Sequence, residues 1–301
     1  MHRTLLAVLF VAAFASVCAQ VSSAAQRPAP VTVTPEWLAG RLQDPKLVVL
    51  HVASLRDDYT REHIPGARFL WPTWFAVTTP DLGYELASVD SLTAVLRRLG
   101  VSNDSEIVLY HVLGDVAGTA RMYVTLDYLG MGDRTKILDG GLPAWKAAGQ
   151  PVTKEEPKYA PGTFVPAVRK DVVMHLDTMR SRYHSEGTKV IDARSPQAYN
   201  ADKGEGVFRG GHIPGAVNIP YTALFDSLDR YQPLDSIAAK FEKAGVKPGT
   251  DVIVYCGSGR TASPLYIAAK MLGFNVRLYD GSFQEWSRKE DLPVEQTKPK
   301  K

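Results

Sequence analysis

Short hydrophobic runs alternate with helically spaced apolar residues along most of the chain. In the last third, β-rich runs predict strands at Lys189–Ile191, Asp251–Tyr255 and Val276–Tyr279. Between them, apolar residues recur at helical spacing over Leu234–Ala244 and Ser263–Leu272. This alternation predicts an α/β fold, in which helices cover both faces of a mostly parallel sheet.

The first apolar run lies near the N-terminus and differs from the later ones in predicting a targeting segment. Leu5–Val17 spans thirteen almost uninterrupted apolar residues, follows Arg3, and leads to small residues with cleavage points after Ala19 or Ala25. This pattern is typical of a secretory signal peptide. We therefore expect residues 1–25 to be removed and the mature protein to be periplasmic or secreted.

Two other interpretations of this run are weaker. A transmembrane anchor needs about 20 apolar residues, and no later segment is long and apolar enough to span a bilayer. A lipid anchor at Cys18 would need a small residue where Val17 stands. Removal of the leader also removes Cys18, so Cys256 becomes the single cysteine of the mature chain.

The mature chain contains several short patterns twice. Offsets of 141 to 149 residues separate the copies, which predicts two tandem domains at about 31–153 and 168–297. The segment 154–167, rich in Pro, Lys and Glu, is expected to be the linker. The repeated patterns are His63–Ala67 with His212–Ala216, Gly100–Tyr110 with Gly245–Tyr255, and Asp139–Gly141 with Asp280–Ser282.

Composition narrows the class of protein. A length of 301 residues suits about two domains, and 45% hydrophobic with 22% charged residues is ordinary for a globular protein. The formal net charge of +3 is too balanced to predict nucleic-acid binding. Two cysteines exclude a disulfide-stapled scaffold and zinc sites built from several thiolates.

The candidate chemistry follows the strand that ends at Tyr255. In open parallel sheets, ligands bind beyond the carboxyl ends of the strands. Backbone amides of small loop residues can converge on one point and form an anion-binding nest. Cys256, beside such a nest, a helix start and Arg260, should be a thiolate and a nucleophile toward an anionic substrate. A buried, inert thiol is the alternative. The loop consists of Gly257, Ser258, Gly259, Arg260, Thr261 and Ala262.

These motifs, in this order and repeated, resemble the rhodanese superfamily, and the tandem arrangement resembles the thiosulfate and 3-mercaptopyruvate sulfurtransferases. The resemblance covers nearly all of the mature chain and implies two rhodanese-like domains with the active loop in the second. It implies that Cys256 is catalytic, that the loop amides bind the substrate, and that Arg194 binds its anion. The family places further substrate cations where Lys203 and Arg209 stand. The structural alternatives are an ion pair between Arg194 and Asp192, and solvated loop charges at the other two positions.

Other conspicuous side chains are expected to be structural. His63 and His212 are tempting as acid–base groups, but the same histidine stands in both copies of the turn, which favours a role in turn structure. Trp145 and Trp286 are expected to pack helices.

The two copies differ at the chemical positions. The first copy lacks the nucleophile and both cations, so the first domain is expected to be catalytically silent and to shape one wall of the cleft. The corresponding pairs are Cys256 and His111, Arg260 and Asp115, and Arg194 and Ala53.

The resemblance implies a two-step sulfur transfer without a metal or organic cofactor. The Cys256 thiolate takes the outer sulfur of thiosulfate, sulfite leaves, and the persulfide rests in the amide nest. A small thiophilic acceptor, cyanide or a thiol, then removes the sulfur. The protein is expected to act without nucleic acid and without a membrane span. The sequence leaves its oligomeric state open, with a monomer as one option.

The donor is less clearly indicated. The loop Cys256–Gly259 resembles that of 3-mercaptopyruvate sulfurtransferases. Those enzymes also use an Asp where Thr73 stands here, then a His that this chain lacks before His111, and an apolar residue in place of Arg260. A guanidinium favours the compact thiosulfate dianion over a keto acid monocarboxylate. We therefore favour thiosulfate, with 3-mercaptopyruvate as the alternative.

Other classes of protein fit the sequence less well. A cysteine-based phosphatase or arsenate reductase needs an arginine six positions after Cys256, where Ala262 stands. A dithiol oxidoreductase needs a second cysteine. A non-catalytic persulfide carrier or binding protein stays open as a third possibility.

Overall fold

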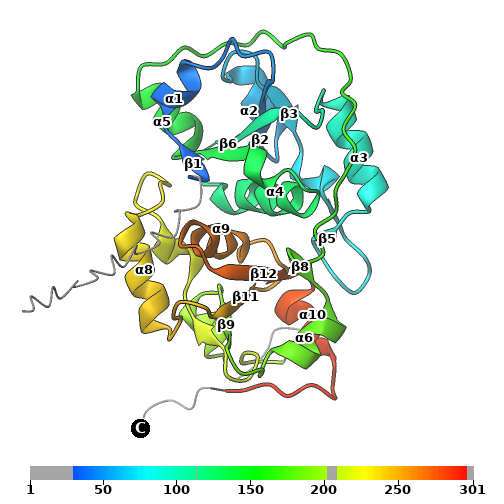
Figure 1. Cartoon of the computed structure of the whole chain (residues 1–301), viewed down its shortest axis with the longest axis vertical. Coiled ribbons are helices and arrows are strands. Elements are labelled where there is room, and N and C mark those ends of the chain that lie inside the picture. The colour runs from blue at the N-terminus through cyan, green and yellow to red at the C-terminus, as the bar shows by residue number, and fades with distance from the viewer. Residues whose placement is uncertain (1–29, 113, 202–208, 297–301) are drawn as a thin grey trace, which may run out of the picture.

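The structure is a computed structural model that describes residues 30–112, 114–201 and 209–296. Two α/β units lie one above the other in Figure 1. Each contains a five-stranded sheet in which all neighbouring strands pair in parallel. The predicted α/β fold with two tandem units is therefore confirmed.

The first unit contains a sheet of order β1-β7-β6-β2-β3 and a small antiparallel pair, β4 with β5. Its strands are β1 (Thr32–Val33), β2 (Leu47–Val52), β3 (Arg68–Leu70), β4 (Ala76–Val77), β5 (Glu85–Leu86), β6 (Glu106–His111) and β7 (Thr135–Leu138). Its helices are α1 (Pro35–Ala39), α2 (Arg56–Arg61), η1 (Pro72–Trp74), α3 (Val89–Arg98), α4 (Val116–Tyr128), η2 (Gly132–Arg134) and α5 (Gly141–Ala147).

The second unit repeats this plan, with the sheet order β8-β12-β11-β9-β10 when read from the equivalent edge. Its strands are β8 (Val173–Met174), β9 (Thr188–Asp192), β10 (Val217–Asn218), β11 (Asp251–Tyr255) and β12 (Asn275–Tyr279). Its helices are α6 (Leu176–Arg182), α7 (Pro196–Tyr199), η3 (Tyr221–Leu224), α8 (Leu234–Lys243), α9 (Ser263–Met271) and α10 (Ser282–Arg288).

The predicted strands and helices of the last third are all present. β11 lies at the centre of its sheet, where Ile253 is in register with Val190 on one side and Arg277 on the other. Strands in this position are buried on both faces, which explains why β11 reads as a continuous apolar run rather than an alternating one. The central position also places the carboxyl end of β11, and the residue that follows it, in the middle of the sheet edge.

The two units share one hydrophobic core. Helices α4 and α9 face each other between the two sheets (Figure 1), and a single cluster of buried apolar residues runs through both. Every residue of α4 from Ala117 to Asp127 is buried. A helix buried all round lies within a core rather than on a surface. The first unit is therefore packed against the second over the length of α4.

The segment 154–167, expected to be the linker, lies along the first unit. Phe164 is fully buried, and its carbonyl accepts a hydrogen bond from Arg97 Nε at 2.7 Å. Asn103 exchanges two hydrogen bonds with the backbone of Val165. This segment therefore adds to the core of the first unit as well as joining it to the second.

Two predictions lie outside the described residues: the signal peptide at 1–25 and the substrate cation Lys203. Within the part of the chain that is described, no helix is both long enough and apolar enough to cross a bilayer.

Candidate active site

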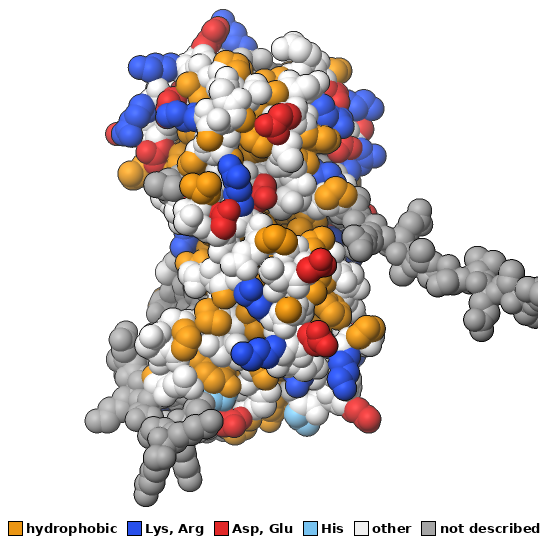
Figure 2. Space-filling model, turned by 90° about the vertical axis from the view of Figure 1, so that its left-hand side faces the viewer, with side chains coloured by type: hydrophobic (Ala, Val, Ile, Leu, Met, Phe, Trp, Pro, Cys, Tyr) orange, Lys and Arg blue, Asp and Glu red, His pale blue; other side chains and the backbone are white. Residues whose placement is uncertain are grey.

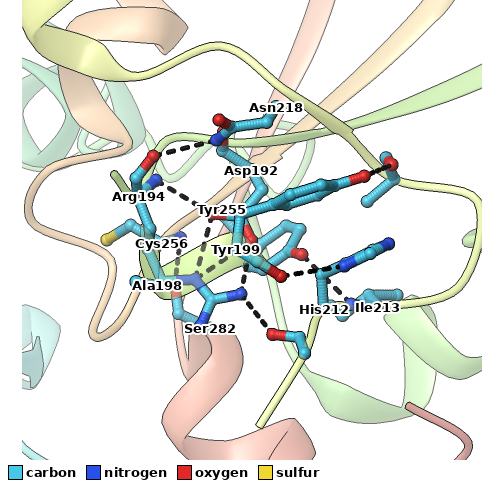
Figure 3. A network of polar contacts seen from close by, with 12 residues as sticks. Asp192, Arg194, Ala198, Tyr199, His212, Ile213, Asn218, Tyr255, Cys256 and Ser282 are labelled. Atoms are coloured by element: carbon cyan, nitrogen blue, oxygen red, sulfur yellow. Dashed lines mark hydrogen bonds and ion pairs between the residues drawn. The ribbon is translucent and has the colours of Figure 1, made fainter. Parts of the chain in front are cut away.

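Cys256 is the first residue after β11, and its side chain is almost fully buried, with 1% of its surface exposed. It is the one free cysteine among the described residues. Figure 3 shows its sulfur pointing away from the polar network built around Asp192 and Arg194. The sulfur therefore faces the side of the loop that follows it.

That loop, residues 257–262, runs from Cys256 to the start of α9. None of its six backbone amides donates a hydrogen bond to another described residue, whereas its carbonyls do accept them: Gly257 from the Gln284 N–H at 3.0 Å, and Arg260 from the Ser263 N–H at 3.2 Å. Unpaired amides beside a helix N-terminus provide a site for an anion. The loop backbone is thus held by its acceptors while its donors stay available.

Gly259 and Gly257 differ in backbone conformation and in the space around them. Gly259 adopts the left-handed backbone conformation, with φ of +77°. A Cβ there would lie 2.8 Å from the Asp280 carbonyl oxygen and 2.9 Å from Arg121 Nη1. Gly257 is exposed, and a Cβ there would meet nothing within 4 Å. Glycine is therefore required at 259, where the loop lies close against its support, and not at 257.

Ser282 is a site residue that the sequence analysis did not identify. Its Oγ accepts a hydrogen bond from the Cys256 N–H at 3.2 Å and donates one to the Tyr279 carbonyl at 2.9 Å. The equivalent residue of the first unit is Gly141, where a Cβ would lie 2.4 Å from the His111 carbonyl oxygen. The available signal was the change from Asp-Gly-Gly in the first copy to Asp-Gly-Ser in the second.

Arg194 forms the ion pair that the sequence left open as its alternative role. Its Nε lies 3.1 and 3.0 Å from the two carboxylate oxygens of Asp192, and its Nη2 lies 2.6 Å from Oδ2 (Figure 3). Nη2 also donates to the Gly211 carbonyl at 2.8 Å, and the guanidinium carbon lies 4.0 Å from the Phe283 ring centroid. Arg194 thus has a structural role, and its contact with a substrate stays a prediction.

Arg260 is not the isolated cation that the sequence suggested. Its Nη2 forms an ion pair with Asp115 Oδ1 of the first unit, while 37% of its side chain stays exposed. Asp115 stands in the first unit at the position equivalent to Arg260. Because the two units face each other, this carboxylate neutralises the loop cation of the second unit.

Three other side chains singled out in the sequence, Arg209, His63 and His212, make structural contacts. Arg209 donates to the backbone carbonyls of Ser287 and Lys289, both at 2.8 Å, so it fastens the end of α10. His63 and His212 each stack on a tyrosine ring, with centroids 3.9 and 3.8 Å apart, and each ring nitrogen Nδ1 pairs with that tyrosine's carbonyl. This matches their expected role in the repeated turn.

The two tryptophans pack as expected. Trp145 and Trp286 are fully buried, and their Nε1 atoms each donate to a proline carbonyl at 2.8 Å.

Residues of the first unit contact the loop and the residues around it. Arg121 of α4 is fully buried, forms an ion pair with Asp280, and reaches the Gly259 carbonyl at 3.5 Å. Asp280 also accepts a hydrogen bond from the Leu86 N–H at 3.0 Å. Gln284 of α10 exchanges two hydrogen bonds with the backbone of Gly83. The first domain therefore contacts the loop and the residues that support it, and its expected role in shaping the active cleft stays a prediction.

The position equivalent to Cys256 in the first unit is filled by a buried histidine. Burial lowers the pKa of His111 to about 4, so its ring is neutral at pH 7. Among the described residues, neither ring nitrogen has a hydrogen-bond partner. This position therefore has no thiol that could carry a persulfide. The described residues also contain no group of three His, Cys, Asp or Glu side chains placed to hold a metal ion.

Comparison with known proteins assigns the chain to a family. The model of the rhodanese-like domain matches residues 34–148 and 175–289. The chain is 32% identical to a thiosulfate sulfurtransferase of Azotobacter vinelandii, over 88% of this chain and 97% of that protein. It is 31% identical to the sulfur carrier protein TtuD of Thermus thermophilus, over 88% and 96%.

A solved structure agrees with these matches. SseA of Escherichia coli, described in work on 3-mercaptopyruvate sulfotransferases, superposes with a TM-score of 0.75 at 30% identity, over 84% of this chain and 99% of SseA. The chain therefore belongs to the rhodanese family of sulfurtransferases and contains two rhodanese-like domains.

Proposed function

We propose that this sulfurtransferase moves the outer sulfur of thiosulfate to a thiophilic acceptor through a persulfide on Cys256. One observation supports the proposal most strongly. The thiol of Cys256 stands beside six consecutive backbone N–H groups, and none of them donates a hydrogen bond to a described residue. Amides fixed in this way stabilise negative charge without rearranging when the charge appears.

The proposed reaction has two displacements on sulfur. In the first, the Cys256 thiolate attacks the outer sulfur of thiosulfate, the S–S bond of the donor breaks, and sulfite leaves with the bonding electron pair. The terminal sulfur of the persulfide then lies beside the loop amides. In the second, cyanide or a thiolate attacks that terminal sulfur, and the Cys256 thiolate is regenerated.

Thiosulfate is favoured by the charge available at the loop. Nη2 of Arg260 forms an ion pair with Asp115, and 37% of the Arg260 side chain stays exposed beside the loop. Thr73 is exposed on η1 and supplies no carboxylate for the keto acid donor. Arg260 and Thr73 therefore favour a small oxyanion as the sulfur donor, because such a donor needs no proton transfer from the first domain.

A second candidate donor is 3-mercaptopyruvate. The observation in its favour is the ion pair between Arg260 and Asp115, because a neutralised loop attracts a dianion less strongly than a free guanidinium would. The two donors differ in charge, so the choice between them is an electrostatic one.

Steady-state kinetics with both donors against cyanide test the proposal. We expect thiosulfate to have the larger kcat/KM in the wild type. Arg260→Val leaves Asp115 unpaired at the loop and should lower kcat/KM for thiosulfate about tenfold or more, and that for 3-mercaptopyruvate less. Lys247→Gln, which removes an exposed cation four residues before β11, is the matched control and should leave the ratio unchanged.

Two outcomes would contradict the proposal. A wild type that prefers 3-mercaptopyruvate would make the keto acid the donor. A persulfide that forms but turns over with neither cyanide nor a small thiol would instead favour a sulfur carrier.

A further inference from the structure

One ion pair between the two rhodanese-like domains joins residues at equivalent positions of the repeat, Arg260 and Asp115. Arg260 stands four residues after Cys256, and Asp115 stands four residues after His111, the equivalent of that cysteine. Their ion pair joins the two domains at the edge of the catalytic loop. The silent domain thus places a negative charge beside the one cation of residues 257–262.

Asp115 is held in place independently of Arg260. It is the N-cap of α4, and its Oδ1 accepts the Gly118 N–H at 3.0 Å. A Cβ at Gly118 would lie 2.6 and 2.7 Å from the two carboxylate oxygens, so glycine leaves the room that this carboxylate occupies. On its other side, the Gly114 N–H donates to Asp229 of the second domain at 2.9 Å.

The loop cation is therefore matched to a fixed anion. The Asp115 side chain is 16% exposed and that of Arg260 is 37% exposed, so solvent screens the pair only in part. The Arg260 guanidinium also lies 5.8 Å from the ring of Tyr84, another residue of the silent domain. With its charge balanced, the loop gains little from each additional negative charge on a ligand.

We propose that Asp115 sets the charge preference of the Cys256 site: the silent domain lowers the capture of dianionic reagents relative to monoanionic and neutral ones. The part of this inference that concerns sulfur donors rests on the proposed function. The part that concerns the electrostatic potential at Cys256 holds whichever reaction the protein catalyses. Asp115 is thus a specificity-determining residue that lies in the domain without the cysteine.

The test is the ratio of the rates at which iodoacetate and iodoacetamide alkylate Cys256. The two reagents are similar in size and differ by one negative charge. Any change in the fraction of thiolate affects both rates alike, so the ratio reports the local potential. Asp115→Asn removes the charge while asparagine keeps the capping hydrogen bond.

We expect Asp115→Asn to raise the iodoacetate to iodoacetamide ratio by roughly three- to tenfold at low salt, and Arg260→Val to lower it. High salt should reduce both changes. Asp90→Asn removes the same charge from the exposed first turn of α3 and should leave the ratio unchanged. An Asp115→Asn ratio equal to that of the wild type, or to that of the Asp90→Asn control, would overturn the inference.

The donor kinetics give a second, separate measurement. Asp115→Asn should raise kcat/KM for thiosulfate roughly tenfold relative to that for 3-mercaptopyruvate, mainly through KM. A lower ratio would contradict the inference. A protein that uses neither donor would defeat the proposed function, while the alkylation ratio would still decide the role of Asp115.

Discussion

At the scale of single residues, Ser282 combines a strained backbone with a hydrogen bond that it accepts from the Cys256 N–H. Its φ of +52° is unfavourable for a residue with a side chain, and its first-domain equivalent is a glycine at +56°. Such strain costs on the order of 1–3 kcal/mol and persists where the surroundings impose it. Here the Ser282 hydroxyl accepts a hydrogen bond from the backbone N–H of Cys256, a residue that is almost fully buried at the end of β11.

Two substitutions at Ser282 separate the strain from the hydrogen bond. Ser282→Ala keeps a side chain at the strained backbone position and leaves the Cys256 N–H unpaired. It should therefore lower the free energy of unfolding by about 1–3 kcal/mol. Ser282→Gly loses the same bond but relieves the backbone strain, so it should be the more stable of the two. Urea denaturation of both variants measures the difference. A glycine variant less stable than the alanine variant would contradict this account.

At the scale of elements, the connection from β11 to α9 is shaped by its contact with the first domain. The loop lies on the Asp280 carbonyl and on Arg121, so Gly259 has both an unusual φ and no room for a side chain. Gly257, two residues earlier, has neither constraint. The loop is therefore close-packed on one side and open on the other.

Alanine at each glycine tests this asymmetry. Gly259→Ala should cost about 1–3 kcal/mol of stability, since the new Cβ must displace backbone or a buried arginine in a conformation that alanine disfavours. It should also lower activity, because the loop amides shift. Gly257→Ala should change the free energy of unfolding by less than about 0.5 kcal/mol. Equal destabilisation by the two variants, measured by thermal unfolding, would contradict the described contact.

At the scale of the whole molecule, the two domains are joined by buried charges as well as by apolar contacts. Arg121 and Asp280 form a fully buried ion pair across the interface, and Asp127 pairs with both Tyr266 and Lys270 of α9. Breaking one partner of such a pair leaves an uncompensated buried charge, which is strongly destabilising. The first domain is therefore tied to the loop at residues 257–262 and to α9, which follows it.

The interface should also respond to pH through Glu85. Burial, and then the nearby carboxylates of Asp280 and Glu285, raise its pKa from 4.5 to about 7. The folded state therefore binds more protons than the unfolded state between these values, and this group's contribution to stability falls as pH rises from about 4.5 to 7. Glu85→Gln should stabilise the protein relative to the wild type at pH 8 more than at pH 5. A difference in Tm that is the same at both pH values would contradict the shift.

Much of this arrangement could be predicted from local patterns. The duplication, the parallel sheets and the position of Cys256 after a buried strand all follow from the hydrophobic pattern and the repeated motifs. The contacts of Arg260, Arg121 and Ser282 could not be predicted in this way. They depend on which faces of the two domains meet, and on backbone conformation at a turn, neither of which a one-dimensional pattern contains.

The central claim is that Cys256 carries the sulfur and that the first domain carries none. Peptide mass spectrometry after incubation with thiosulfate tests it most directly, in the wild type, in Cys256→Ser and in His111→Cys. We predict one added sulfur in the wild type, on the peptide that contains Cys256, and none in Cys256→Ser, which should stay folded because the change is nearly isosteric. His111→Cys should gain no second sulfur at a comparable rate, because Asp115 and Ala53 still stand where the second domain has cations. Sulfur bound by Cys256→Ser, or a wild type that stays unmodified, would contradict the account.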